Sequence, residues 1–142
     1  MMISTKGRYA VRIMVDLAEH SSGTNVPLKE MAGRQEISLK YLEQIMSILV
    51  KGGLVEGAHG KGGGYRLTRE PEDYKIGEIL RLTEGDLSLV PCLETGDTTC
   101  PRVAMCRTYD LWQGLAQVIN QYLDSVTLSD LMKKEYVNNH VI

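Results

Sequence analysis

Apolar residues recur every three or four positions in five stretches of the chain, which is the period of a helix with one buried face. Ser4 and Ser38 are N-cap types that open the first and third stretches. Pro27 falls where the first turn of the second helix tolerates it, and Gly52-Gly53 ends the third helix. The apolar positions that define the five predicted helices are Ala10, Ile13, Met14 and Leu17; Leu28, Met31 and Ala32; Leu42, Ile45, Met46 and Leu49; Ile76, Ile79 and Leu80; and Leu111, Leu115, Val118 and Tyr122.

Between the third and fourth helices the pattern changes to that of a β-hairpin. Leu54-Val55 begins one strand and Tyr65-Arg66-Leu67 forms the returning strand. Three helices followed by a hairpin predict a winged helix-turn-helix, so the fold class is mainly α with a small β-hairpin. We divide the chain into a winged helix-turn-helix DNA-binding domain (1–84), a cysteine-bearing loop (85–107) and a long dimerisation helix with a short C-terminal helix capped by Thr127 and Asp130 (108–142).

The apolar stripe of the long helix suits a partner helix, and a homodimer is the commonest assembly of soluble chains. The alternative is that the stripe packs on its own domain.

Composition and charge narrow the function classes. The chain has 142 residues, 43% of them apolar and 24% charged, with Trp112 as its single tryptophan and no phenylalanine. No apolar run approaches the roughly 18 residues of a membrane span, so we expect a cytoplasmic protein. The net charge of −2 conceals +4 over residues 1–69 and −6 over residues 70–142. A basic first half favours a polyanionic partner, and it places Lys6 and Arg8 among the candidate DNA contacts.

The third helix carries the candidate base-reading side chains. Gln44 can pair with adenine, Lys40 and Lys51 with guanine edges or phosphates, and Glu43 can accept from the N4 amine of cytosine. Most polar helix faces are merely solvated, and that remains the alternative reading. The candidate DNA contacts on this helix are Ser38, Lys40, Tyr41, Glu43, Gln44 and Lys51.

Five glycines between Gly57 and Gly64 form a turn that we first test as a phosphate loop. A Walker A loop needs Gly-Lys-Ser/Thr, which is missing, and the dinucleotide fingerprint fails at Tyr65. As a wing, the turn presents His59 and Lys61 at its tip and lets the backbone approach DNA closely. The alternative is a plain hairpin turn. No catalytic motif occurs elsewhere in the chain, so we predict that the protein is not an enzyme.

Cys92, Cys100 and Cys106 lie in one polar stretch, with seven and five residues between them. Thiolates so placed can bind zinc or an iron–sulfur cluster, and both need four ligands. Three unrelated thiols are the alternative. The histidines of the chain are all distant in sequence, so they offer no local fourth ligand.

Three stretches carry a resemblance to a known family. Ser4 to Ala10 (STKGRYA), Ile37 to Gln44 (ISLKYLEQ) and Gly60 to Tyr65 (GKGGGY) resemble the IscR-type iron–sulfur cluster transcriptional regulators. That superfamily also holds the nitric-oxide-sensing NsrR and cysteine-metabolism CymR repressors. The three cysteines, Leu111-Trp112 and Thr127-Leu128 fit as well, so the resemblance covers nearly the whole chain.

The resemblance implies a homodimeric repressor-type regulator that binds a double-stranded DNA operator. It implies that Cys92, Cys100 and Cys106 hold an iron–sulfur cluster of the [2Fe–2S] type. The sequence departs from the family at three positions: Tyr109 stands where the IscR branch has a histidine ligand, Arg8 where the NsrR branch has an aspartate ligand, and His59 where the IscR branch has a wing-tip arginine. The local candidates for the fourth ligand are Glu94, Asp97 and Asp110, besides water or a small thiol.

Two other hypotheses stay open at the level of sequence. The same winged-helix regulator can lack a cluster and use its thiols or zinc as the sensor, or respond to a partner protein. A winged-helix module can also bind only proteins and no nucleic acid.

Overall fold

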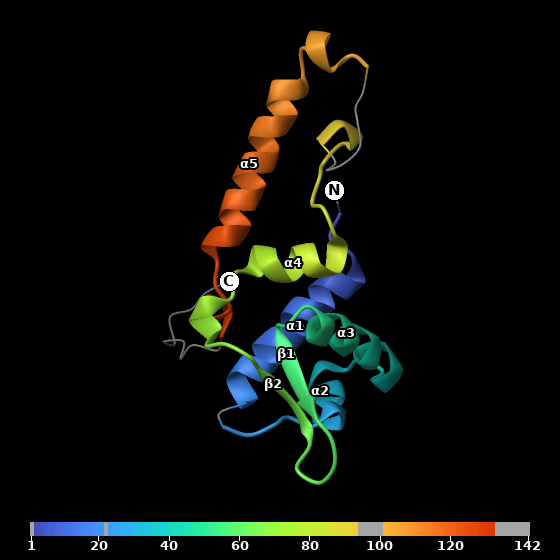
Figure 1. The fold of residues 1–142 in the computed structure, drawn as a ribbon, viewed down its shortest axis with the longest axis vertical. Helices are drawn as coiled ribbons and strands as arrows, with labels where there is room; N and C mark the ends of the chain where they lie inside the picture. Colours follow the sequence, from blue (N-terminus) through green and yellow to red (C-terminus); the bar gives the residue numbers. More distant parts are fainter. Residues whose placement is uncertain (1, 22, 94–100, 133–142) are drawn as a thin grey trace, which may run out of the picture.

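The computed structural model describes residues 2–21, 23–93 and 101–132 (Figure 1). Three helices, α1 (Thr5–His20), α2 (Leu28–Gln35) and α3 (Leu39–Lys51), precede a hairpin of β1 (Val55–Ala58) and β2 (Gly64–Leu67). Helix α4 (Ile76–Glu84) crosses above them, and the long helix α5 (Tyr109–Ser125) rises from one end of α4. Single 3₁₀ turns lie at Pro71–Asp73, Pro91–Leu93, Val103–Met105 and Ser129–Leu131. The hairpin tip and the start of α5 therefore lie at opposite ends of the molecule.

The predicted caps begin the helices of the helix-turn-helix. The Ser4 hydroxyl accepts from the Gly7 amide at 3.2 Å, and the Ser38 hydroxyl accepts from the Tyr41 amide at 3.2 Å. Pro27 is the N-cap of α2 and so stands one residue ahead of the first turn. Helix α2 ends at Gln35, and its C-cap residue Glu36 has a left-handed φ of 54° that redirects the chain into α3.

The two strands pair antiparallel in the register Val55↔Leu67 to Ala58↔Gly64. Two further bonds, Val26 N to Tyr65 O at 2.8 Å and Tyr65 N to Val26 O at 2.9 Å, attach the hairpin to the segment before α2. A Cβ at Gly64 would lie 2.4 Å from the Val26 carbonyl oxygen. The glycine is required because the hairpin and that segment approach so closely.

The winged-helix part of the chain holds the hydrophobic core. Tyr74 is its largest fully buried side chain. The Tyr74 hydroxyl donates to Leu54 O at 2.7 Å and accepts from the amides of Thr68 and Arg69, so its burial leaves no polar atom unpaired. The predicted inner faces of α1, α3 and α4 are all buried; the core residues are Ala10, Ile13, Met14, Leu17, Val26, Met31, Ile37, Leu42, Ile45, Met46, Leu49, Leu54, Val55, Tyr74, Ile76, Ile79, Leu80, Leu87 and Leu128.

The predicted short last helix is instead a single 3₁₀ turn, Ser129–Leu131. The capping-box bonds do form, from Thr127 N to an Asp130 carboxylate oxygen at 2.9 Å and from Asp130 N to Thr127 Oγ1 at 3.3 Å. The backbone bonds of the turn span three residues, and the chain is extended again at Met132. The box therefore closes one turn that covers the core with Leu128. None of the helices in the described ranges is long and apolar enough to cross a membrane.

Candidate nucleic-acid interface and cysteine loop

Helix α3 turns its polar face outward, as the spacing of its apolar residues predicts. Lys40, Glu43, Gln44 and Lys51 are exposed, whereas the opposite face is buried against α1 and the hairpin. Ser38 is exposed and its hydroxyl is used as the helix cap. This arrangement leaves the side chains of α3 free to meet base edges in a major groove.

Tyr41 has a second role that the sequence did not indicate. Its half-buried ring packs edge-on against the ring of Tyr9, with the centroids 5.9 Å apart and the planes at 87°. The Arg12 guanidinium lies over the other ring, 4.9 Å from the Tyr9 centroid. Tyr41 therefore joins the start of α3 to α1, and the aromatic pair fixes how the two helices meet.

The start of α1 lies beside the start of α3. Thr5, Tyr9, Ser38 and Tyr41 line a shallow hollow of about 350 Å³ between them. Arg8 is exposed and donates to the Thr5 hydroxyl at 3.1 Å, and Lys6 is half-buried. Glu36 also lines the hollow, and the start of α1 already carries the Glu84 carboxylate on Ser4.

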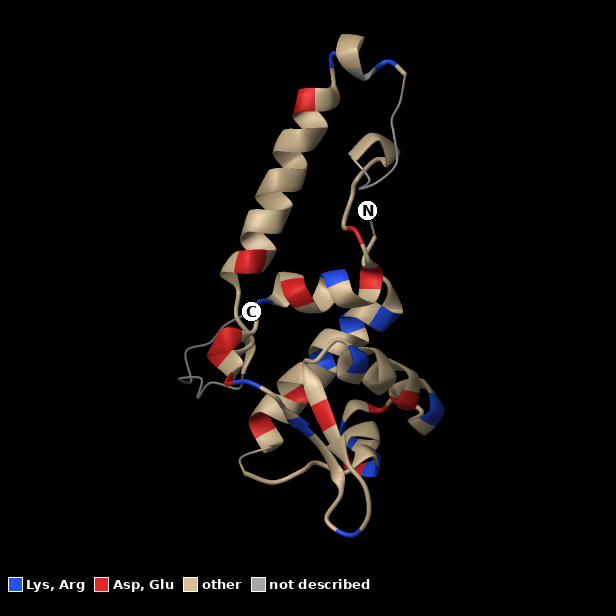
Figure 2. Ribbon diagram, in the orientation of Figure 1, with Lys and Arg blue, Asp and Glu red and all other residues tan. Residues whose placement is uncertain are grey.

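The wing and α3 form the two walls of a groove of about 630 Å³. Glu43, Ser47 and Lys51 line it from α3, and His59 lines it from the hairpin. Lys61 is exposed at the hairpin tip, outside the groove lining, as are Lys40 and Gln44 on α3. Figure 2 shows a basic position at the tip of the hairpin, at the end of the molecule away from α5. The structure therefore brings the candidate side chains of α3 and the wing to two neighbouring ridges.

A part-buried ion pair, with Asp16 fully buried and Arg34 partly exposed, holds α2 against α1 behind this surface. The Arg34 guanidinium donates twice to the Asp16 carboxylate, at 2.9 and 2.7 Å, and Gln35 Nε2 donates to it at 2.8 Å. Burial raises the pKa of Asp16, but the hydrogen bonds from Arg34 and Gln35 outweigh it and hold the pKa below its ordinary value. Sequence reasoning missed this network because its members stand 18 and 19 residues apart with no shared motif.

Two of the three cysteines lie in the described part of the chain. Cys92 and Cys106 are half-buried free thiols, one on each side of residues 94–100, which contain Cys100 and the candidates Glu94 and Asp97 and lie outside the described residues. The Cys106 sulfur is 3.4 Å from the Thr108 hydroxyl, and this contact lowers the pKa of the thiol. The donor type fits a thiolate-ligated metal or cluster.

The described residues do not by themselves complete a metal site. Within 2–21, 23–93 and 101–132, no three His, Cys, Asp or Glu side chains gather as a metal ion requires. Asp110 is exposed in the first turn of α5, and Tyr109 beside it is half-buried.

Within residues 2–21, 23–93 and 101–132, nothing covers the apolar stripe of α5. Leu111, Leu115, Val118 and Tyr122 are 59%, 42%, 62% and 66% exposed, and α5 has no buried residue. The half-buried Trp112 lies just beside this stripe.

One known protein family matches nearly the whole chain. The family Rrf2, described as iron-dependent transcriptional regulators, matches residues 3–134. The chain belongs to the Rrf2 family.

Individual Rrf2 relatives agree with this. The HTH-type transcriptional regulator IscR of Vibrio atlanticus is 41% identical over 137 residues, covering 96% of this chain and 78% of that protein. Among solved structures, T. potens IscR is 39% identical with a TM-score of 0.72, covering 92% of this chain and 85% of that one. CymR, the global cysteine regulator of B. subtilis, is 37% identical with a TM-score of 0.75, covering 92% of this chain and 95% of that one.

These relatives confirm two expectations of the sequence. The resemblance to IscR-type regulators is correct, and so is the winged-helix fold class with its five helices and two-stranded hairpin. The Rrf2 relatives are transcriptional regulators rather than enzymes, which agrees with the missing catalytic motifs.

Proposed function

We propose that the protein is a homodimeric DNA-binding transcription regulator of the IscR type, whose DNA binding is controlled by an iron–sulfur cluster. The observation that carries the proposal is the pair of ridges formed by α3 and the wing, on a fold shared with T. potens IscR at 39% identity. Their spacing suits a recognition helix in the major groove and a wing on the flanking backbone or minor groove.

Each ridge has a separate task. On α3, Gln44 pairs with adenine, and Glu43 accepts from cytosine and repels misplaced phosphates. Lys40 and Lys51 reach guanine edges or phosphates. On the wing, His59 and Lys61 contact the backbone or minor groove, where the family's arginine is missing. Lys6 and Arg8 at the start of α1, and Ser38 and Tyr41 at the start of α3, contact the phosphate backbone of the DNA.

The homodimer forms through α5. Four large apolar side chains stand exposed on one stripe of a 17-residue helix, and a second copy of the same stripe would cover them. A two-fold dimer carries two recognition helices and therefore reads two half-sites.

Cys92, Cys100 and Cys106 hold the cluster, of the [2Fe–2S] type, with the fourth ligand drawn from Glu94, Asp97, Asp110, water or a small thiol. When bound, the cluster supplies a centre that responds to iron supply, oxidation or nitric oxide. The chain's part is to link residues on both sides of 94–100 to the start of α5, so that loss of the cluster frees a loop beside the dimer helix.

The DNA-binding arm is tested by measuring affinity for operator and random duplexes at several salt concentrations. Affinity should fall steeply with salt because lysine–phosphate contacts release counterions. Lys40→Ala and Lys61→Ala should weaken binding to every sequence, and Gln44→Ala should also relax specificity. Lys75→Ala, an exposed lysine at the start of α4, is the matched control that leaves affinity unchanged. Salt-independent binding, or none, would favour a module that recognises proteins.

The cluster arm is tested by measuring iron, sulfide and zinc per chain on protein purified without oxygen. A visible absorption spectrum with about two iron and two sulfide per chain is expected for a [2Fe–2S] cluster. Cys92→Ala should lose the iron and change DNA affinity, and equal iron in the variant would refute the ligand assignment. A colourless protein that resists anaerobic reconstitution would refute the cluster and favour sensing by thiols or zinc. The presence of Tyr109 in place of a histidine ligand is the observation that supports this second hypothesis.

A further inference from the structure

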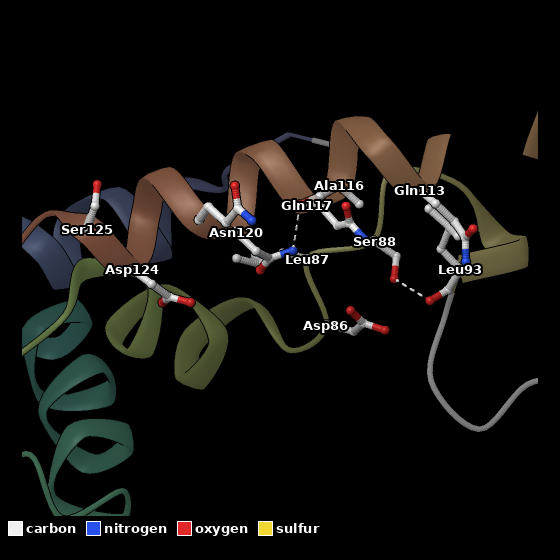
Figure 3. A pocket seen from close by; sticks show the side chains of 11 residues that line it. Asp86, Leu87, Ser88, Leu93, Gln113, Ala116, Gln117, Asn120, Asp124 and Ser125 are labelled. Carbon is white, nitrogen blue, oxygen red and sulfur yellow. Dashed lines mark hydrogen bonds between the residues drawn. The ribbon is translucent and has the colours of Figure 1, made fainter. Parts of the chain in front are cut away.

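Helix α5 is joined to the winged-helix part at its C-terminal end. There Ile76 N donates to Val126 O at 2.9 Å, and Leu128 N donates to Tyr74 O at 3.0 Å. Further along the helix, a groove of about 590 Å³ lies between α5 and the segment that follows α4, with Leu87, Ser88 and Leu93 on one wall (Figure 3). The direction of α5 is therefore decided near its last two turns.

At that joint, one arginine of α4 holds two side chains of α5. Arg81 donates to both carboxylate oxygens of Asp124, each at 2.9 Å, and its Nη2 also donates to Asn120 Oδ1 at 2.8 Å. The Asn120 amide is itself oriented by donating to Ala116 O at 2.9 Å. We call Arg81, Asn120 and Asp124 the clamp. A planar guanidinium bound at three points restrains rotation as well as distance, which a single contact cannot do.

The backbone of α4 runs directly beneath the clamp. A Cβ at Gly77 would lie 2.2 Å from Asp124 Oδ1 and 3.0 Å from Arg81 Nη1. Any side chain there would displace the carboxylate from the guanidinium. Gly77 thus allows α4 and α5 to approach closely enough for the clamp to close.

The other side of α4 is fixed to the DNA-binding helices. The Glu84 carboxylate accepts from Ser4 N at 3.0 Å and from Ser4 Oγ at 2.5 Å, which ties the end of α4 to the start of α1. Arg69, just after the hairpin, makes a two-point bond to Glu78 with both distances 2.8 Å. Helix α4 is therefore tied to α1 and to the segment after the hairpin, and the clamp is a polar joint between that body and α5.

We propose that the clamp sets the separation of the two half-sites that the dimer accepts. The inference rests on the proposed function, because it needs a dimer that forms through α5. Helix α5 has 17 residues and is about 25 Å long. A rotation of roughly 10° at the clamp thus shifts its far end by about 4 Å, close to the roughly 3.4 Å rise of one base pair. The three clamp residues are positioning residues, which need no contact with DNA.

The test measures affinity for duplexes in which the spacing between two half-sites is changed one base pair at a time. The wild type should prefer one spacing by at least tenfold over spacings one base pair longer or shorter. Arg81→Ala should reduce that preference to threefold or less while its affinity for a single half-site stays unchanged. Sedimentation should show that the variant is still a dimer.

Arg69→Ala is a closely matched control. The side chains of Arg69 and Glu78 are 37% and 38% exposed, and those of Arg81 and Asp124 are 38% and 35% exposed. Each pair is a two-point arginine–carboxylate bond with one member on α4. The Arg69 pair lies within the body, and the bonds from Ser4 to Glu84 still hold α4 to α1 when Arg69 is replaced, so its loss should leave the spacing preference intact. Asp124→Asn, which keeps the shape and removes the charge, should give an intermediate preference and serves if Arg81→Ala does not fold.

The outcomes separate the clamp from the proposed function. A wild type that binds no duplex in a salt-dependent way would refute DNA binding, and with it this inference. If the wild type and both clamp variants prefer one half-site spacing equally sharply, the role of the clamp is refuted and the proposed function is not. Variants that become monomers would also overturn it, because the clamp would then act on assembly rather than on direction.

Discussion

The body of the molecule (residues 2–87) and helix α5 have similar apolar patterns, but their apolar faces differ in burial. In the body, the inner faces of α1, α3 and α4 are buried in one core. On α5, the stripe of Leu111, Leu115, Val118 and Tyr122 is exposed. The body buries its apolar faces against one another, whereas the described residues leave the stripe of α5 uncovered. A regular apolar period therefore predicts a helix with one apolar face, but not what covers that face.

The largest effect should come from placing charge on the stripe. Leu111→Glu with Val118→Glu would bury two carboxylates between the copies, so the dimer should be lost at micromolar concentration. Affinity for a two-half-site operator should fall by roughly 10²–10⁴-fold, because the second half-site is no longer bound within one complex. Sedimentation and operator binding measure both results, and circular dichroism should be unchanged. Gln113→Glu, on the opposite face of α5, is the control; a stable dimer in the double variant would contradict the assignment.

The next largest effect should come from truncating a buried side chain in the body. Leu49→Ala removes a fully buried side chain of α3 and should lower the free energy of unfolding by about 2–5 kcal/mol. Leu111→Ala makes the same chemical change at a side chain that the single chain leaves exposed. It should weaken the dimer and leave the unfolding of the isolated monomer within about 0.5 kcal/mol. Denaturant titrations at low and high chain concentration measure the two effects, and equal losses at both positions would remove the contrast between the regions.

A smaller contrast separates two aspartates that each accept a two-point bond from arginine. Asp16 is 1% exposed and Asp124 is 35% exposed. Asp16→Asn should lower the free energy of unfolding by about 3 kcal/mol at pH 7, and Asp124→Asn by about 1 kcal/mol or less.

The pH dependence of the Asp16 pair follows from its pKa. Because the folded pKa lies below the unfolded one, the stabilisation is complete above about pH 4 and is lost as the pH falls toward the folded pKa. Asp16→Asn should therefore differ most from the wild type at neutral pH and least in acid. Unfolding midpoints between pH 2 and 7 measure this. A difference that grows as the pH falls would contradict the assigned direction.

Much of the fold could be predicted because its signals are local. Ser4 and Ser38 cap the helices that their positions indicate, and Gly52-Gly53 follows the end of α3. The wing glycines also mark a real constraint, since Gly60, Gly62 and Gly64 all have positive φ.

What the sequence did not predict depends on residues far apart in the chain. The Asp16–Arg34 pair, the Tyr9–Tyr41 contact and the clamp each join elements whose relative placement only the tertiary structure supplies. The candidate DNA contacts were predictable as an exposed face because they occupy the positions between the buried ones. Their roles in reading bases, and the cluster ligation by Cys92, Cys100 and Cys106, stay predictions that the experiments above test.

Trp112 gives the molecule a built-in optical reporter. It is the single tryptophan of the chain, and it is half-buried beside the α5 stripe, with its amide bonded to the Thr108 carbonyl oxygen at 3.2 Å. Selective excitation of the indole therefore reports on the end of α5 next to Cys106. The winged-helix body has tyrosine but no tryptophan, so it contributes no indole emission. Emission from the unlabelled protein can therefore test both the proposed dimer and the proposed cluster loading, without modifying any of its thiols.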